Sequence, residues 1–360
     1  MSVPTTDEVI DIVSAFFTIK GVNQTPKSLV IEIGDHDLMK RFQAVAQRME
    51  QRNLVASLER DTGATFIVIS SFRPPKSRRT WIPRVLFGGT VTTVMIDGYY
   101  RAIATNSIAK VGDPLFVAFL YTVSLMGILG IHELGHMIAS KRHGIKISWP
   151  YFIPGIPIIG FIPTFGALIL SRGLIINKNM LFDIGISGPV AGLLVAIAVS
   201  TYGAYLSPMI SAQEAHTLSS QHGLLEIHSS MLMDATIILM HKHVPGEEMI
   251  MSPVMLAAWF GFLLTFLNLL PAWQLDGGHV ARATVGPRRH RVLTYASIGI
   301  LAVSGYYIMA LFVLALSMRT GDARPLDDIS PLSPRRRRMF PFIMVLAFLC
   351  APLPFSLLSQ

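Results

Sequence analysis

The sequence contains a single cysteine, Cys350, and only 14% charged residues. One cysteine excludes an intramolecular disulfide and any cysteine-rich zinc or iron–sulfur site, and its apolar surroundings predict a small core or lipid-facing residue. The amino terminus, Met1–Glu8, is acidic and lacks a basic start followed by an apolar run, so we expect no secretory signal there. Apolar residues make up 51% of the 360 residues, and a soluble fold with so few charges could not cover its own surface. The composition therefore predicts a membrane protein.

The first eighty residues differ from the rest and predict a small cytoplasmic α+β domain. Leu29–Ile33 and Gly63–Ser70 have the composition of strands. Asp37–Gln51 has helical spacing of its apolar residues, with Asp35 or Asp37 as its cap. Arg73–Pro75 is typical of a linker. Such a domain is either a packed module without chemistry of its own or a regulatory or substrate-docking domain, and both interpretations stay open.

Six apolar runs predict an all-α polytopic membrane domain over residues 81–360, separate from the domain over 1–80. A helix needs about 20 predominantly apolar residues to cross the hydrocarbon core of a bilayer. The first run is short and contains threonines, so it is the weakest of the set. The predicted spans are Val85–Ile96, Pro114–Ile131, Leu181–Leu206, Val254–Trp273, Val292–Met318 and Met339–Leu358.

The distribution of lysine and arginine predicts a multi-pass protein of the cell membrane with its amino terminus in the cytoplasm. Basic residues concentrate before the first span, between the second and third, and after the fourth. The loop 319–338 should then lie outside, yet it contains six arginines. Either the last spans are miscounted or this loop binds lipid phosphates. The basic residues expected on the cytoplasmic side are Arg73, Lys76, Arg78, Arg79, Arg84, Lys141, Arg142, Lys146, Arg172, Lys178, Arg282, Arg288, Arg289 and Arg291.

The strongest motif is His132-Glu133-Leu134-Gly135-His136, where the second predicted span ends. Residues four apart share one face of a helix, so both imidazoles can bind one metal ion. Glu133 then lies beside the metal and can take a proton from a bound water. These groups are costly to bury at the end of an apolar run unless they are paired or bind a metal. The alternative is a polar cluster at a span terminus.

A zinc ion needs a third protein ligand, and Asp276 is the best candidate because it follows another apolar span. Pro271 ends that helix, and Gly277-Gly278 allow the backbone to turn tightly. Both motifs approach the cytoplasmic side in the charge analysis, so we expect them, and the active site, at the same depth.

The two motifs resemble those of the site-2 proteases, which are intramembrane zinc metalloproteases with six spans in the archaeal and plant-type members. The resemblance covers roughly residues 85–290 and implies a catalytic core of about 113–290 within the membrane domain. The amino-terminal domain, the first span and the loop 319–338 lie outside it. The residues that carry it are His132–His136, Leu275-Asp276-Gly277 with Asn268 and Pro271 before them, Phe165-Gly166, and Gly188–Gly192.

By this resemblance, His132, His136 and Asp276 would bind one zinc ion per chain and Glu133 would be the general base. Asn268 would help to hold the substrate or the oxyanion. A structural hydrogen bond between spans is the alternative for that amide.

Other polar residues near these motifs are expected to have ordinary roles. We expect His279 to be a loop histidine, with a place behind the ligands as the alternative, and Asp183 to be an interfacial residue rather than a ligand. The loop 207–252 is too short and irregular for the periplasmic insert frequent in the family. Its histidines predict a solvated loop, with a metal- or pH-responsive patch as the alternative. They are His216, His222, His228, His241 and His243.

A helical substrate must unwind before its peptide bonds become accessible, and one segment is suited to bind the unwound strand. Trp149–Pro163 is apolar but broken by prolines, so it is neither a normal span nor a soluble loop. Thr164–Leu170 follows without proline. We expect a re-entrant hairpin beside the zinc, buried in protein, with a strand edge facing the substrate.

These residues predict an intramembrane zinc endopeptidase that cuts a transmembrane helix of a membrane-tethered protein. Its partners would be a transmembrane protein substrate and the lipid bilayer, with no nucleic acid. The alternatives are a membrane metal-ion transporter, a catalytically silent homologue and a membrane zinc peptidase that acts at chain ends. Glu133 separates the first alternative from the prediction, because a transporter needs no base beside two helical ligands.

Overall fold

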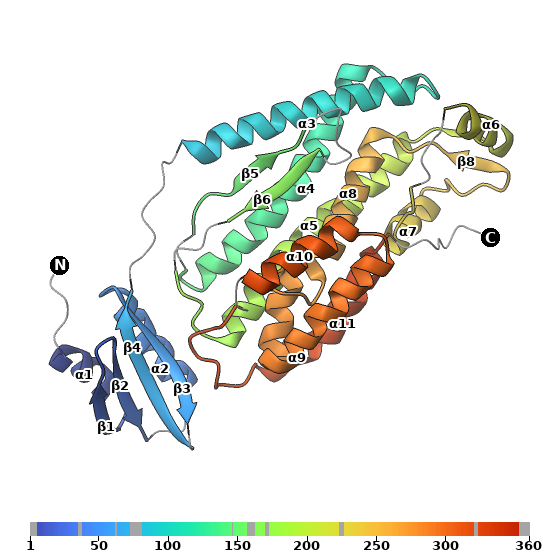
Figure 1. Cartoon of the computed structure of the whole chain (residues 1–360). Helices are drawn as coiled ribbons and strands as arrows, with labels where there is room; N and C mark the ends of the chain where they lie inside the picture. Colours follow the sequence, from blue (N-terminus) through green and yellow to red (C-terminus); the bar gives the residue numbers. More distant parts are fainter. Residues whose placement is uncertain are drawn as a thin grey trace.

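The computed structural model describes residues 6–34, 38–61, 63–72, 81–145, 147–156, 163–169, 173–222, 227–319 and 323–352. A small α+β domain lies at one end of a bundle of helices, and a two-stranded hairpin lies along the first long helix of that bundle (Figure 1).

The amino-terminal domain is a four-stranded antiparallel sheet packed against helices. The strands follow the order β1-β2-β4-β3, and alternate side chains of β2 and β4 are buried. This period-2 burial is expected for strands with one face on a core, and the two predicted strands, Leu29–Ile33 and Gly63–Ser70, are confirmed. The elements are α1 (Thr6–Ser14), β1 (Ile19–Gln24), β2 (Ser28–Ile33), α2 (Met39–Glu50), β3 (Leu54–Asp61) and β4 (Ala64–Ser71).

The predicted helix over Asp37–Gln51 is confirmed as α2, which buries Phe42, Val45 and Met49 against the sheet. Asp35 and Asp37, its predicted caps, lie outside the described residues, as does the linker Arg73–Pro75. β1 has no clear sequence signal, because this edge strand is mostly exposed and lacks the apolar alternation of a buried strand.

The rest of the chain is mainly helical, and within its described part α4 and α5 are long and apolar enough to cross a membrane. Both helices expose large apolar side chains, such as Phe116 and Leu194, which are 58% and 66% exposed. Extensive exposed apolar surface is unfavourable in water and favourable in lipid, so the chain is a membrane protein. The helices are α3 (Ile82–Asn106), α4 (Pro114–Arg142), α5 (Lys178–Leu206), α8 (Pro253–Leu269), α9 (Asp276–Val303), α10 (Tyr307–Arg319) and α11 (Pro334–Cys350).

The fifth predicted span, Val292–Met318, is wrong because the chain turns back inside it. α9 ends at Val303, Gly305 adopts a left-handed φ of 84°, and α10 begins at Tyr307. Only glycine adopts that φ readily, and the N–H of the following residue then bonds back to Leu301 O at 2.8 Å. Since α9 and α10 also pack against each other, this run is a helical hairpin rather than one helix.

The six-span count predicts that the loop 319–338 lies on the side opposite the amino-terminal domain, and this is wrong for the same reason. The hairpin returns the chain to the side of the amino-terminal domain, where Leu326 O accepts a hydrogen bond from Leu58 N at 2.8 Å. Its arginines therefore lie on the same side as the other basic clusters. The miscounted span explains the conflict in the charge pattern.

The extended hairpin expected from Trp149–Leu170 is present, but it is not buried in protein as expected, because Trp149 and Leu168 are 74% and 58% exposed. β5 (Tyr151–Pro154) pairs antiparallel with β6 (Thr164–Leu168) and packs along α3, where the rings of Phe87 and Phe152 meet edge to face with centroids 5.3 Å apart. Residues 157–162, which connect the strands, lie outside the described part of the chain.

The segment 207–252 is more regular than predicted. Its described residues form two helices and a two-stranded sheet, and none of its described histidines belongs to a group of three potential metal ligands. The elements are β7 (Met209–Ser211), α6 (Ala212–His222), α7 (Met231–Leu239) and β8 (Glu247–Met249).

Candidate metal centre

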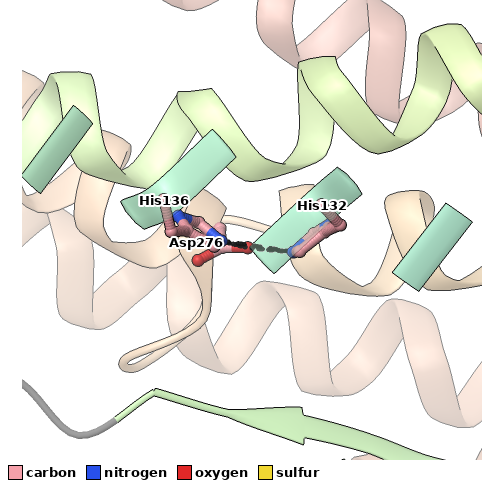
Figure 2. Close-up of side chains that lie close together, drawn as sticks. All are labelled: His132, His136 and Asp276. Carbon is pink, nitrogen blue, oxygen red and sulfur yellow. Dashed lines mark hydrogen bonds and ion pairs between the residues drawn. The ribbon is translucent and has the colours of Figure 1, made fainter. Parts of the chain in front are cut away.

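Three side chains from α4 and α9 converge inside the helical bundle. Asp276 Oδ2 lies 3.3 Å from His132 Nε2 and 3.2 Å from His136 Nε2, and the two Nε2 atoms are 3.2 Å apart. Figure 2 shows both imidazole rings pointing toward the carboxylate. They form the one group of three or more potential metal ligands found in the described residues.

The histidine pair faces one side because α4 continues without a break past the predicted end of the span at Ile131, as far as Arg142. Asp276 is placed by the break between α8 and α9. α8 ends at Leu269, and Asp276 is the first residue of α9. A Cβ on Gly277 would lie 2.0 Å from Leu269 O, so only glycine allows this tight connection.

The donor atoms fit a metal ion. His136 Nδ1 lies 2.8 Å from Ile184 O, and since a carbonyl can only accept, Nδ1 carries a proton and Nε2 is the ring atom that can bind a metal ion. A partly buried carboxylate this close to two imidazole nitrogens is unfavourable unless a metal ion or a proton lies between them. Two imidazoles and one carboxylate are a common zinc set that leaves a fourth position for water.

α5 approaches this centre closely because it carries glycines opposite the histidines. A Cβ on Gly188 would lie 2.1 Å from His136 Nε2, and one on Gly192 would lie 3.0 Å from His132 Cβ. Larger residues would displace the imidazoles or push the helices apart. This contact gives the motif Gly188–Gly192 its physical reason.

The two predicted catalytic residues also lie at the centre. Glu133 is buried on α4, one residue after His132. Asn268, in the last turn of α8, has its Nδ2 3.3 Å from His132 Nε2. The structure thus brings all five predicted site residues together, from three helices.

His279 is not a loop histidine as predicted. It lies in the first turn of α9, one turn after Asp276, and its Nδ1 is buried with no hydrogen-bond partner among the described residues. A side chain in this position lies behind the ligands, which was the alternative interpretation.

Asp183 is not a ligand, and the structure shows its partners. Its two carboxylate oxygens accept from Arg336 Nε and Nη2, each at 2.6 Å, and Oδ2 lies 2.9 Å from His143 Nε2. Sequence reasoning missed Arg336 as a partner. The sequence feature that could have indicated this pair is an acidic residue, Asp183, near the start of an apolar helix, together with the unexplained run Arg335–Arg338.

Comparison with known proteins supports the chemistry of this site. Residues 120–313 match a model of peptidase family M50. The probable zinc metalloprotease EGY2, chloroplastic, of rice (Oryza sativa subsp. indica) is 29% identical over 240 residues, which are 63% of this chain and 41% of the rice protein. EGY2 of Arabidopsis thaliana is 27% identical over 240 residues (64% and 41%), and rice EGY3 is 28% identical over 275 residues (72% and 45%).

The chain therefore spans less than half the length of these curated relatives. No solved structure matches it. The family match covers more than half of the 360 residues and includes His132, His136 and Asp276. The chain belongs to peptidase family M50, a family of zinc metalloproteases.

Proposed function

We propose that this chain is an intramembrane zinc endopeptidase that hydrolyses a peptide bond within or near a transmembrane helix of a membrane-tethered protein. The observation that carries the proposal is the convergence of His132, His136 and Asp276, with Glu133 buried beside them, inside helices with apolar outer surfaces. A base next to two helical ligands serves hydrolysis and has no use in ion transport. The site therefore favours a peptidase over a transporter.

The three ligands would hold one zinc ion per chain. When bound, zinc supplies Lewis acidity to a peptide carbonyl and to the attacking water. Glu133 accepts the proton of that water at its carboxylate and passes it to the leaving amine. Asn268 donates its amide N–H to the substrate oxygen as negative charge develops on it.

The hairpin β5–β6 offers a place for the unwound substrate. The sheet has two strands, so in the described residues β6 keeps one edge without a strand partner, where backbone groups can pair with an extended peptide. Leu168 on β6 is 58% exposed, and a Cβ at Gly166 would meet nothing within 4 Å, so the strand is not enclosed by other side chains.

Substituting Leu168→Pro tests this edge. Proline removes a backbone N–H from β6, so we expect most of the cleavage activity to be lost while zinc remains bound. The matched variant Leu168→Ala keeps the N–H and should retain most activity. Unchanged cleavage by the proline variant would show that the substrate does not bind along β6.

The proposed function is tested with the full chain purified in detergent. Zinc is measured by mass spectrometry, and the protein is incubated with single-span transmembrane substrates. We expect one zinc per chain and internal cleavage by the wild type, with Glu133→Gln keeping zinc and losing roughly 10²–10⁴-fold in rate, the usual contribution of a general base. Glu247→Gln, exposed in β8, makes the same chemical change away from the site and should cleave normally.

Other outcomes would contradict the proposal. Zinc transport that survives Glu133→Gln, together with no cleavage by the wild type, would indicate a transporter. Products that arise only by removal of terminal residues would indicate a peptidase of another kind.

We further propose that the amino-terminal domain and the metal centre lie toward the cytoplasmic side of a multi-pass membrane protein. The lysine and arginine pattern supports this orientation, now including the loop 319–338. The plant relatives carry the word chloroplastic in their names. The membrane of this chain is therefore tested by locating a tagged full-length chain in cells, which distinguishes the cell membrane from an organellar membrane.

A further inference from the structure

Residues 323–336, here called the strap, connect the amino-terminal domain to the helices that carry the metal centre. Leu326 O accepts from Leu58 N of the edge strand β3 at 2.8 Å. On the other side, Leu326 N donates to Ile175 O at 3.0 Å and Asp327 N donates to Ile176 O at 2.7 Å. The strap thus extends the sheet edge and joins it to the residues just before α5.

The hydrophobic core of the amino-terminal domain also continues into the start of α5. Ile176 and Met180, 4% and 1% exposed, belong to the same buried cluster as Phe42 and Leu58. A domain whose core includes the first turn of α5 is docked on the bundle, not merely tethered to it by a linker.

Two buried or half-buried arginine pairs fix the strap to α9, which carries Asp276, and to α5, which packs against the metal centre. Arg282 on α9 is 2% exposed and donates both Nη atoms to Asp328 of the strap, at 3.0 and 2.6 Å. Arg336 makes the corresponding two-point contact with Asp183 on α5, and its Nη1 donates to Ser333 Oγ at 3.0 Å. Two-point arginine–carboxylate pairs fix orientation as well as distance.

Both pairs lie on short routes to the ligands. Asp183 directly precedes Ile184, whose carbonyl accepts the Nδ1 proton of His136 and so orients that ring. Gly185 follows, and a Cβ there would lie 2.7 Å from Asp276 O. Arg282 is on the same helix as Asp276, less than two turns away. The first two turns of α5 therefore contact the strap on one side and the ligands on the other.

We propose that the strap is a positioning element for the metal centre, in which Arg336, through Asp183 and the Ile184 carbonyl, holds His136 in its metal-binding orientation. Arg282, through its contact with Asp328, holds the start of α9 in place and with it Asp276. The amino-terminal domain, by pairing Leu58 with Leu326, stabilises the strap in this place. The inference rests on the proposed function only in taking the three ligands as a zinc site.

Arg336→Gln removes the two-point contact with Asp183, and Arg337→Gln is its matched control, because Arg337 is an exposed neighbour with the same charge. The readout is zinc retained by the full-length protein, measured by mass spectrometry against increasing concentrations of a chelator. We expect Arg336→Gln to bind zinc about tenfold more weakly, as is usual when a group that orients a metal ligand is removed. Arg337→Gln should match the wild type.

Hydrogen exchange and two further variants complete the test. In Arg336→Gln, amide exchange should increase in the first turns of α5 and in the strap, while α8 stays protected. Arg336→Lys keeps the charge without the two-point geometry and should lie between wild type and Arg336→Gln, which preserves the test if the glutamine variant does not fold. The double variant Asp183→Asn/Arg336→Gln should weaken zinc binding no more than either substitution does alone.

Wild-type affinity in folded Arg336→Gln, or equal losses in Arg336→Gln and Arg337→Gln, would overturn the positioning role. A wild-type protein that holds no zinc would instead contradict the proposed function. The two failures are therefore distinguishable.

Discussion

The amino-terminal domain and the helical bundle are built with opposite placements of polar and apolar side chains. In residues 6–72, as far as they are described, Thr65 is the one buried polar side chain and Val22 the one exposed large apolar side chain. From residue 81 onward the described helices bury His132, Glu133 and Arg282, while large apolar side chains face outward. One chain thus contains a region folded with its polar surface toward water and a region whose apolar surface suits lipid.

The difference also extends to how elements contact one another. The amino-terminal domain is held by large apolar side chains that fill its core, as burial from water favours. In the bundle, α4 and α5 meet through small residues such as Gly188 and Gly192, because lipid gives no hydrophobic force for bringing helices together and close packing must replace it. Polar groups inside the bundle are stable where they pair or bind a cation.

The largest expected effect is a loss of stability caused by a substitution in the core of the amino-terminal domain. Phe42→Ala removes a fully buried ring and should destabilise the amino-terminal domain by about 3–5 kcal/mol. Phe312→Ala in α10 removes a ring that is 53% exposed and should change stability by only about 0.5 kcal/mol. Hydrogen exchange of the full chain measures both, and equal costs would show that the two regions do not differ as described.

The second-largest effect is expected from a charge placed on the outer face of the bundle. Leu311 in α10 is 67% exposed. Leu311→Arg should make the free energy of inserting this helix into a membrane less favourable by about 2.5–3.5 kcal/mol. Val22→Arg, on the edge strand of the amino-terminal domain, places the same charge in water and should have little effect. An insertion assay that finds no cost at Leu311 would exclude lipid contact of that face.

The smallest expected effect concerns the glycine contacts. Gly188→Ala forces a methyl group against His136 and should reduce the free energy of zinc binding by about 1–3 kcal/mol, the usual cost of overpacking. In Gly21→Ala of the amino-terminal domain the nearest atom, Glu32 Oε2, lies 3.7 Å away, so zinc binding should not change. Zinc titration of both variants decides whether the close approach of α5 supports the site.

Local patterns predicted the elements and residues whose reason is local. The histidine pair follows from helical spacing, the strands from alternation, and the hairpin β5–β6 from prolines in an apolar run. The glycines before His279 predict a loop, but in the structure they permit close backbone contact at the first turn of α9, which contains His279. Hydropathy predicts one helix over Val292–Met318, because hydropathy does not detect the left-handed turn at Gly305.

By itself, the sequence determined that the chain needs a membrane, where its candidate metal ligands lie, and which of them share a helix face. Only the tertiary structure decided that Asp276 reaches the two histidines, that Arg336 pairs with Asp183, and that the strap joins β3 to the start of α5. Periodicity arises from the geometry of one element, and it records which side of that element is buried. Contacts between residues more than a hundred positions apart depend instead on how all the elements pack, and no local pattern contains that information.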